Sequence, residues 1–195
     1  MPNKLNVLVI HCTATPAGRN VSSDEIRQWH LGPAVTDKSV RYRGKTYTAL
    51  SALPPDKIGG VSVYKLKGRG WSQVGYSDMI HLDGRIENLV PYNADDVVDP
   101  WEITNGILRS SDKYLTSRHV VYVGGCEKGN PQKAEDTRTE AQLKALFAYV
   151  MRTIQAVPAI RISGHNQFDT KACPSFDVPA WCKSVGIADK NIYKP

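Results

Sequence analysis

The sequence lacks any apolar run that approaches the length of a membrane-spanning helix. It also lacks a recognisable secretory signal, because Met1-Pro2-Asn3-Lys4 leads directly into a short strand-like run with no cleavage site behind it. We therefore expect a protein that is made in the cytoplasm without a signal peptide and does not insert into a membrane.

Cysteine is also scarce, with four residues in the whole chain: Cys12, Cys126, Cys173 and Cys182. Four cysteines would permit two disulfides, but a chain without a secretion signal is expected to keep its thiols reduced. We predict that Cys12, Cys126 and Cys182 are buried free thiols, which is the usual state of unpaired cysteine. Cys173 has neighbours that suggest a different role.

Internal repeats, low-complexity segments and nucleic-acid-binding motifs are absent as well. The net charge of +6 suggests a polyanionic partner, such as nucleic acid, a membrane surface or an anionic cell-wall polymer. The positive charges are scattered, and no helix-turn-helix, zinc-finger or RNA-binding motif accompanies them. The sequence therefore favours a cell-wall partner and predicts no binding of nucleic acid.

The 195 residues are enough for one domain with a proper core. Residues 4–12, 118–123 and 160–163 have the apolar patterns of strands, and Asp83-Gly84 is a strong hairpin turn between two further strands. Helices are expected to begin after Ser22 or Ser23, after Thr137 or Thr139, and after Asp177. This interleaving predicts a single α/β domain, residues 1–195, with a central mixed β-sheet flanked by helices.

The second of these helices is the longest. Its predicted core-facing stripe consists of Leu143, Leu146, Phe147, Val150, Met151 and Ile154.

Residues 31–69 form an inserted excursion in this interpretation. A hairpin is predicted around Arg43-Gly44, and Pro54-Pro55 and Gly59-Gly60 interrupt the rest of the segment. The segment is either a decorative loop or one wall of a substrate groove, since long loops often carry specificity.

His165 and Cys173 lie close enough in sequence for one short loop to direct both side chains toward the same point. Neutral imidazole and thiolate are good zinc ligands, but two ligands do not complete a site. The best candidate for the third ligand is His11, which ends the apolar run Val7-Leu8-Val9-Ile10. Three protein ligands leave a fourth position for water, which is the catalytic rather than the structural pattern.

With these residues in place, the sequence resembles the zinc-dependent N-acetylmuramoyl-L-alanine amidases, which include the amidase-type phage lysozymes and share a fold with animal peptidoglycan recognition proteins. Val123-Gly124-Gly125 also fits the pattern. The resemblance depends mainly on four segments in the same order: His11-Cys12-Thr13-Ala14-Thr15, Glu25-Ile26-Arg27-Gln28-Trp29-His30, Gly70-Trp71-Ser72-Gln73-Val74-Gly75-Tyr76 and Lys171-Ala172-Cys173-Pro174-Ser175-Phe176-Asp177.

The resemblance implies that His11, His165 and Cys173 bind Zn²⁺. It also implies catalytic roles for Tyr76 and Lys171 in orienting water or stabilising the oxyanion. Many relatives carry a histidine in the loop before the Val-Gly-Gly strand. This chain has Asn105 in that region, which could hydrogen-bond substrate but could not transfer a proton. His30 and His81 are expected to be structural, and His119 is expected to lie on a strand.

The resemblance therefore predicts a zinc amidase that hydrolyses the bond between N-acetylmuramic acid and L-alanine in bacterial peptidoglycan. We expect a monomeric lysis enzyme of a phage or prophage, which reaches the cell wall after a phage holin permeabilises the membrane. One alternative is a cytosolic amidase that recycles soluble muropeptides. Another is a module that binds peptidoglycan without cutting it.

Overall fold

The computed structural model describes residues 4–104 and 116–195 of the chain. These residues form two compact units. The larger unit comprises residues 4–20, 76–103 and 116–195, and the smaller one comprises residues 21–75 with residue 104. Each unit contains a buried apolar cluster of its own.

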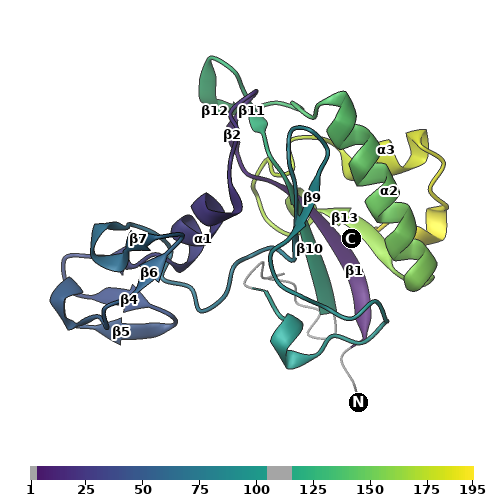
Figure 1. Cartoon of the computed structure of the whole chain (residues 1–195). Coiled ribbons are helices and arrows are strands. Elements are labelled where there is room, and N and C mark those ends of the chain that lie inside the picture. Colours follow the sequence, from purple (N-terminus) through teal and green to yellow (C-terminus); the bar gives the residue numbers. More distant parts are fainter. Residues whose placement is uncertain (1–3, 105–115) are drawn as a thin grey trace. The chain divides into compact units, whose positions relative to one another are not determined.

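The larger unit is built on a five-stranded sheet (Figure 1). Its strands, in spatial order, are β13 (Arg161–Gly164), β1 (Leu5–Cys12), β10 (Thr116–Tyr122), β8 (Asp78–Ile80) and β9 (Ile86–Asn88). The first four strands run parallel, and β9 pairs antiparallel with β8. The predicted α/β fold with a central mixed sheet is therefore confirmed.

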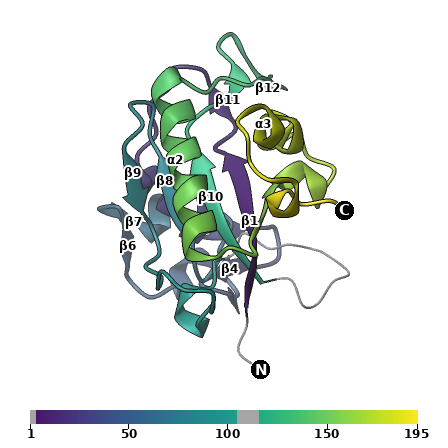
Figure 2. The same cartoon turned by 90° about the vertical axis from the view of Figure 1, so that its right-hand side faces the viewer.

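β1 is one of the two middle strands of the parallel part, and its residues from Val7 to Cys12 are all buried. A strand that is covered on both faces requires such a continuous apolar run. Helix α2 (Glu140–Ala156) lies over one face of the sheet (Figure 2). The core on this face includes Leu8 and Ile10 of β1 together with Leu146 and Val150 of α2.

The side of α2 that faces the core differs from the predicted stripe. Thr139 caps the helix, and the side-chain amide of the fully buried Gln142 donates to the backbone oxygens of Ile80 and Val123, at 3.3 and 2.9 Å. These bonds fix which side of α2 faces the sheet. The apolar pattern used for the prediction could not reveal this, because it counts glutamine as a surface residue. Half of the predicted stripe consequently lies at the surface. Its exposed members, each with an exposed fraction of 38–42 %, are Leu143, Phe147 and Met151.

The larger unit also contains a further α-helix, a second sheet and several short 3-10 helices. Helix α3 (Val178–Ser184) begins at its predicted cap, Asp177, and contacts β13. A second, three-stranded sheet consists of β12 (Asn130–Ala134), β11 (Gly125–Glu127) and β2 (Thr15–Pro16). Short 3-10 helices of this unit span Pro100–Glu102, His165–Gln167 and Asp189–Asn191.

The smaller unit begins with helix α1 (Ser23–Leu31), which is capped by Ser22 through a capping box with Glu25. The predicted hairpin turns at Arg43 and Gly44, both of which have a positive φ. The strands of this unit are β3 (Ala34–Val35), β4 (Val40–Tyr42), β5 (Lys45–Tyr47), β6 (Lys57–Ile58) and β7 (Val61–Ser62), and its 3-10 helices span Leu50–Ala52 and Val63–Lys65. Much of residues 31–69 therefore folds around the small apolar cluster of this unit.

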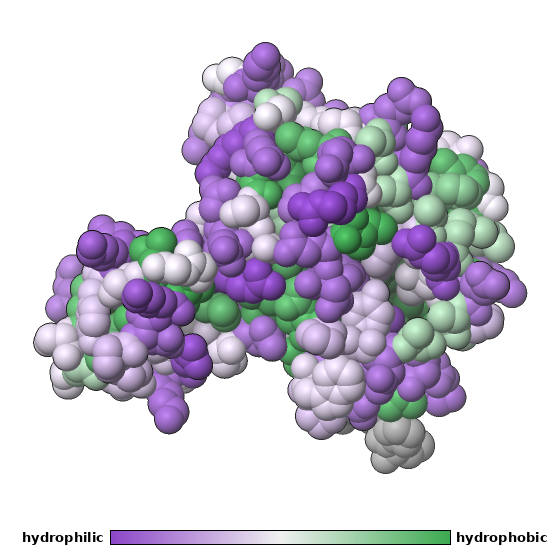
Figure 3. Space-filling view, viewed as in Figure 1, coloured by the Kyte–Doolittle hydropathy of each residue, from purple (hydrophilic) through white to green (hydrophobic). Residues whose placement is uncertain are grey.

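On the face drawn in Figure 3, hydrophobic residues are interspersed among hydrophilic ones. None of the helices in the described part of the chain is long and apolar enough to cross a membrane. All four cysteines are free thiols, and Cys12, Cys126 and Cys182 are buried as predicted.

Candidate active site

The parallel pairing of β1 and β13 brings the two predicted histidine ligands together. Ile10 of β1 is paired with Gly164 of β13, and the next residue on each segment is a histidine: His11, which still belongs to β1, and His165, which follows β13. Parallel strands end at the same edge of the sheet, so the two imidazoles become neighbours. Their ring centroids are 4.6 Å apart.

Cys173 joins these histidines from the loop before α3. The candidate ligand atoms of His11, His165 and Cys173 all lie within 4.8 Å of one another. The separation of His11 Nδ1 and Cys173 Sγ is 3.8 Å. A tetrahedral zinc ion with ordinary bond lengths would hold a nitrogen and a sulfur ligand about 3.6 Å apart. The donor set and this separation fit a zinc ion with three protein ligands.

Hydrogen bonds hold the Cys173 loop at the end of the sheet. The Asn166 N–H donates to the Cys173 carbonyl at 2.7 Å and thereby closes the loop between the second and third ligands. The Tyr122 hydroxyl donates to the Pro174 carbonyl at 2.7 Å, and the Ser175 hydroxyl donates to the Gly125 carbonyl at the same distance. The loop is thus attached to both β10 and β11.

The Cys173 sulfur also accepts a hydrogen bond from the backbone N–H of Cys12, at 3.3 Å. In the protein alone, a hydrogen bond with the Cys12 thiol and burial raise the pKa of Cys173, and the same hydrogen bond lowers the pKa of Cys12. A divalent cation beside Cys173 would reverse this order, because it favours the thiolate that it touches. Burial, followed by the charge of Lys171, lowers the pKa of His165, which keeps this ligand neutral.

The two predicted catalytic residues also belong to the larger unit. The Tyr76 ring lies beside His11, with 5.1 Å between the ring centroids. Lys171 is largely exposed, and its ammonium contacts the Asp169 carboxylate at 3.0 Å. Asp169 in turn lies 3.8 Å from His165 Nε2, which is too far for a hydrogen bond. Asp169 therefore connects Lys171 electrostatically to the ligand cluster, and we did not predict this contact.

His119 is the main residue of the site that sequence reasoning missed. Its Nδ1 lies 2.8 Å from His11 Nε2, and its Nε2 lies 2.8 Å from the Ser117 hydroxyl. Burial, followed by the charge of His165, lowers the pKa of His119 to about 3, so that the imidazole is neutral. Assigning His119 to a strand was correct, but the identity of the neighbouring strand could not be read from the sequence.

The other predicted residues have simpler outcomes. His81 lies 2.9 Å from a Glu87 oxygen, and His30 accepts a hydrogen bond from the Gly75 N–H, which agrees with structural roles for both histidines. Asn105 lies outside the described residues.

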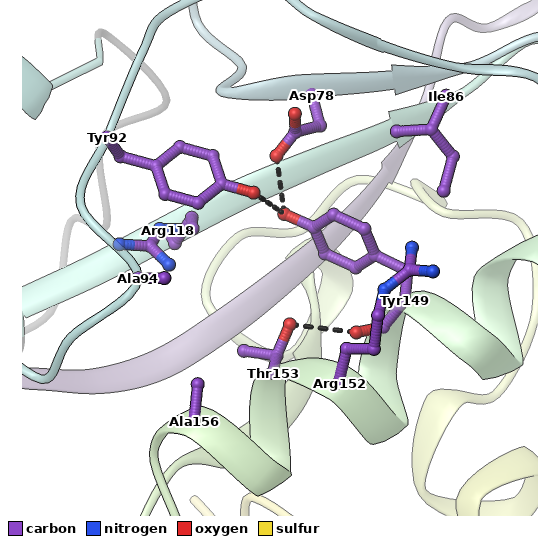
Figure 4. A pocket seen from close by; sticks show the side chains of 9 residues that line it. All are labelled: Asp78, Ile86, Tyr92, Ala94, Arg118, Tyr149, Arg152, Thr153 and Ala156. Carbon is purple, nitrogen blue, oxygen red and sulfur yellow. Dashed lines mark hydrogen bonds between the residues drawn. The ribbon is translucent and has the colours of Figure 1, made fainter.

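A separate cavity of about 270 Å³ lies between β8, β10 and α2 (Figure 4). The buried Asp78 carboxylate in this cavity accepts hydrogen bonds from the Tyr149 hydroxyl at 2.6 Å and from the Asn88 amide at 2.9 Å. The Arg118 guanidinium lies over the Tyr92 ring, 3.7 Å from its centroid. These groups satisfy one another, so we interpret them as a structural network beneath α2.

Comparison with known proteins identifies relatives of the chain. The chain is 30 % identical over 176 residues to the endolysin of Enterobacteria phage K11, which covers 90 % of this chain and 83 % of the relative. It is 25 % identical over 177 residues to the endolysin of Escherichia phage T7, with coverage of 90 % and 84 %. No family model matches the chain.

Two solved structures show the same fold. The Ph2119 endolysin from the Thermus scotoductus MAT2119 bacteriophage matches with a TM-score of 0.52 and 19 % identity, over 99 % of this chain and 88 % of the other. A Drosophila PGRP-LB variant in complex with tracheal cytotoxin matches with a TM-score of 0.53 and 16 % identity, over 100 % and 86 %. The fold is therefore the one that phage endolysins share with peptidoglycan recognition proteins. Within this class, the chain belongs to the phage endolysin family.

Proposed function

We propose that this endolysin is a zinc-dependent amidase that hydrolyses the bond between N-acetylmuramic acid and L-alanine in bacterial peptidoglycan. The observation that carries the proposal is the cluster of His11, His165 and Cys173 at one edge of the sheet. The complex of the Drosophila relative with tracheal cytotoxin supports a substrate of the peptidoglycan class. The endolysin relatives favour lysis of the cell wall over recycling of soluble fragments.

In this proposal His11, His165 and Cys173 hold the metal through two imidazole nitrogens and one thiolate. A zinc ion in such a site acts as a Lewis acid and lowers the pKa of a coordinated water to about 7. The protein contributes a His165 imidazole whose pKa is lowered, chiefly by burial, and a sulfur that already accepts a backbone hydrogen bond. The ligands thus need little rearrangement to bind the ion.

Lys171 and Tyr76 are the proposed catalytic residues of the chain. The Lys171 ammonium, anchored by Asp169, stabilises the negative charge that develops on the oxygen of the scissile carbonyl. The Tyr76 hydroxyl orients the attacking water or donates to the same oxygen. Asn105 remains a proposed hydrogen-bonding contact to the substrate, on the basis of the sequence.

Product analysis tests this function. Purified peptidoglycan should yield stem peptides with a new N-terminal L-alanine and glycan strands of unchanged length, as measured by mass spectrometry. A chelator should abolish the reaction, and added Zn²⁺ should restore it. Cleaved glycan strands, or full activity of a metal-free protein, would contradict the proposal. Faster turnover of soluble muropeptides than of intact sacculi would instead support a recycling amidase.

Substitutions separate catalysis from metal binding. Lys171→Ala and Tyr76→Phe should each retain zinc and the fold but lose about 100- to 1000-fold in rate, because both groups act on the transition state. Lys194→Ala is a matched control, since Lys194 is also an exposed lysine paired with an aspartate. Wall degradation at the parental rate by both site variants would refute their assigned roles.

We also propose that the excursion at residues 31–69 shapes substrate preference. The Gly32 carbonyl accepts a hydrogen bond from the Gly70 N–H at 2.7 Å, so a short Gly-Ser linker in place of residues 33–68 has only a small gap to span. The shortened protein should fold, bind zinc and show altered preference among peptidoglycan types, measured by thermal melting, metal content and product analysis. A shortened chain that fails to fold would assign the segment to the core. Unchanged cleavage of every wall type would leave the segment without a role in specificity.

A further inference from the structure

His119 occupies a defined position next to the first metal ligand. Strands β1 and β10 are parallel, with Val9 opposite His119 and His11 opposite Val121. Alternation along the strands places His11 and His119 on the same face of the sheet. Both imidazoles are almost completely buried, and a distance of 2.8 Å joins His11 Nε2 to His119 Nδ1.

If His11 Nδ1 is the nitrogen that binds the metal, the geometry sets which nitrogen of each ring carries a proton. Nδ1 of His11 is the nitrogen near Cys173 Sγ, at 3.8 Å. A neutral histidine that offers Nδ1 to a metal carries its proton on Nε2. His11 Nε2–H must then donate to His119 Nδ1, and His119 must carry its own proton on Nε2. That proton is donated to the Ser117 hydroxyl at 2.8 Å. Every ring nitrogen of the pair thus has one consistent role.

We propose that His119 is a positioning residue that fixes the tautomer and ring orientation of His11, so that Nδ1 is presented to the metal. The inference rests on the proposed metal-binding function, and it assigns His119 no contact with substrate. Partners of this kind change metal affinity by about 10- to 100-fold when they are removed. A histidine that only filled space in the core would affect stability without this selective effect on the metal.

Three substitutions distinguish these possibilities. His119→Leu fills the position with an apolar side chain of moderate size and removes the acceptor that His119 Nδ1 offers to His11 Nε2–H. His119→Asn places an amide oxygen near the position of Nδ1, so it can restore the acceptor. Val120→Ala is the control for general damage to β10, because Val120 is fully buried on the opposite face, in the core beneath α2.

The measurements are zinc affinity by competition with a chelating indicator, the visible spectrum of the Co²⁺-substituted protein, and thermal melting of the metal-free protein. We expect His119→Leu to weaken zinc binding about 10- to 100-fold and to change the Co²⁺ spectrum. His119→Asn should recover most of the affinity, and Val120→Ala should lower the melting temperature while keeping parental affinity and spectrum.

Parental affinity and an unchanged spectrum in His119→Leu would overturn the inference while leaving the proposed function intact. An equal loss of affinity in Val120→Ala would also overturn it, because the effect would then follow stability. Absence of zinc binding by the parental protein would overturn both the inference and the proposed metal chemistry.

Discussion

His30 should give the smaller unit a measurable dependence of stability on pH. The imidazole is 5 % exposed, accepts the Gly75 N–H through Nδ1 and lies against Trp71. Burial, followed by the charge of Arg69, lowers its pKa from 6.5 to about 4. The folded protein therefore holds the neutral ring, whereas the unfolded chain binds a proton more readily as the pH falls.

The sign and size of the effect are set by this difference in pKa. The contribution of His30 to the free energy of unfolding is fully present above pH 6.5 and is lost as the pH falls from 6.5 toward 4. Each pKa unit corresponds to about 1.4 kcal/mol, so the loss between pH 7.5 and pH 4 should be about 3 kcal/mol.

The assay compares the parental protein with His30→Gln by urea unfolding at several pH values, followed by circular dichroism. Glutamine keeps a hydrogen-bond acceptor but does not titrate in this range. Loss of the proposed zinc ion in acid would affect both proteins equally, so the difference between the two curves isolates His30. The parental protein should lose about 3 kcal/mol more than the variant between pH 7.5 and 4. Parallel curves would refute the reasoning.

Two other predictions concern buried contacts. Gln142→Leu should lower the free energy of unfolding by about 2–4 kcal/mol, because the Val123 carbonyl loses its side-chain donor and the Thr139 N–H loses its acceptor, while the Ile80 carbonyl keeps only the Val123 N–H. The exposed Gln155→Leu should change it by less than about 0.5 kcal/mol, and similar losses in urea unfolding would contradict this. In Gly125→Ala the new Cβ would lie 2.4 Å from Cys12 Sγ at a φ of +102°, so zinc affinity should fall by at least about tenfold. Gly129→Ala, whose Cβ would meet nothing within 4 Å, should bind zinc as the parent does, and an indicator titration compares the two.

The elements that were predicted correctly are those whose start or turn is determined by residues close together in the sequence. Ser22 caps α1, Thr139 caps α2 and Asp177 caps α3, because a side-chain oxygen three residues before a free N–H is a local arrangement. The hairpin at Arg43-Gly44 formed where the turn dipeptide indicated it. The resemblance to a family provided the ligand set, which spacing alone left incomplete.

Features that depend on distant partners could not be predicted in the same way. The contact between His119 and His11 requires β10 to be the neighbour of β1, and local patterns do not specify strand order. The predicted core-facing stripe of α2 was partly wrong, because the Gln142 side chain donates to carbonyls on two other segments and so turns a different side of the helix toward the sheet. The salt bridge of Lys171 to Asp169 depends on the conformation of an irregular loop.

The placement of the three ligands along the chain has a consequence for biosynthesis. His11 is synthesised 154 residues before His165 and 162 residues before Cys173 (positions 11, 165 and 173). At ordinary rates of synthesis of about 5–20 residues per second, roughly 10–30 s pass between the synthesis of His11 and that of the other two residues. An unfinished chain, or one cut short before position 165, has one ligand of three. The proposed metal centre can therefore assemble only after the chain has been synthesised through Cys173.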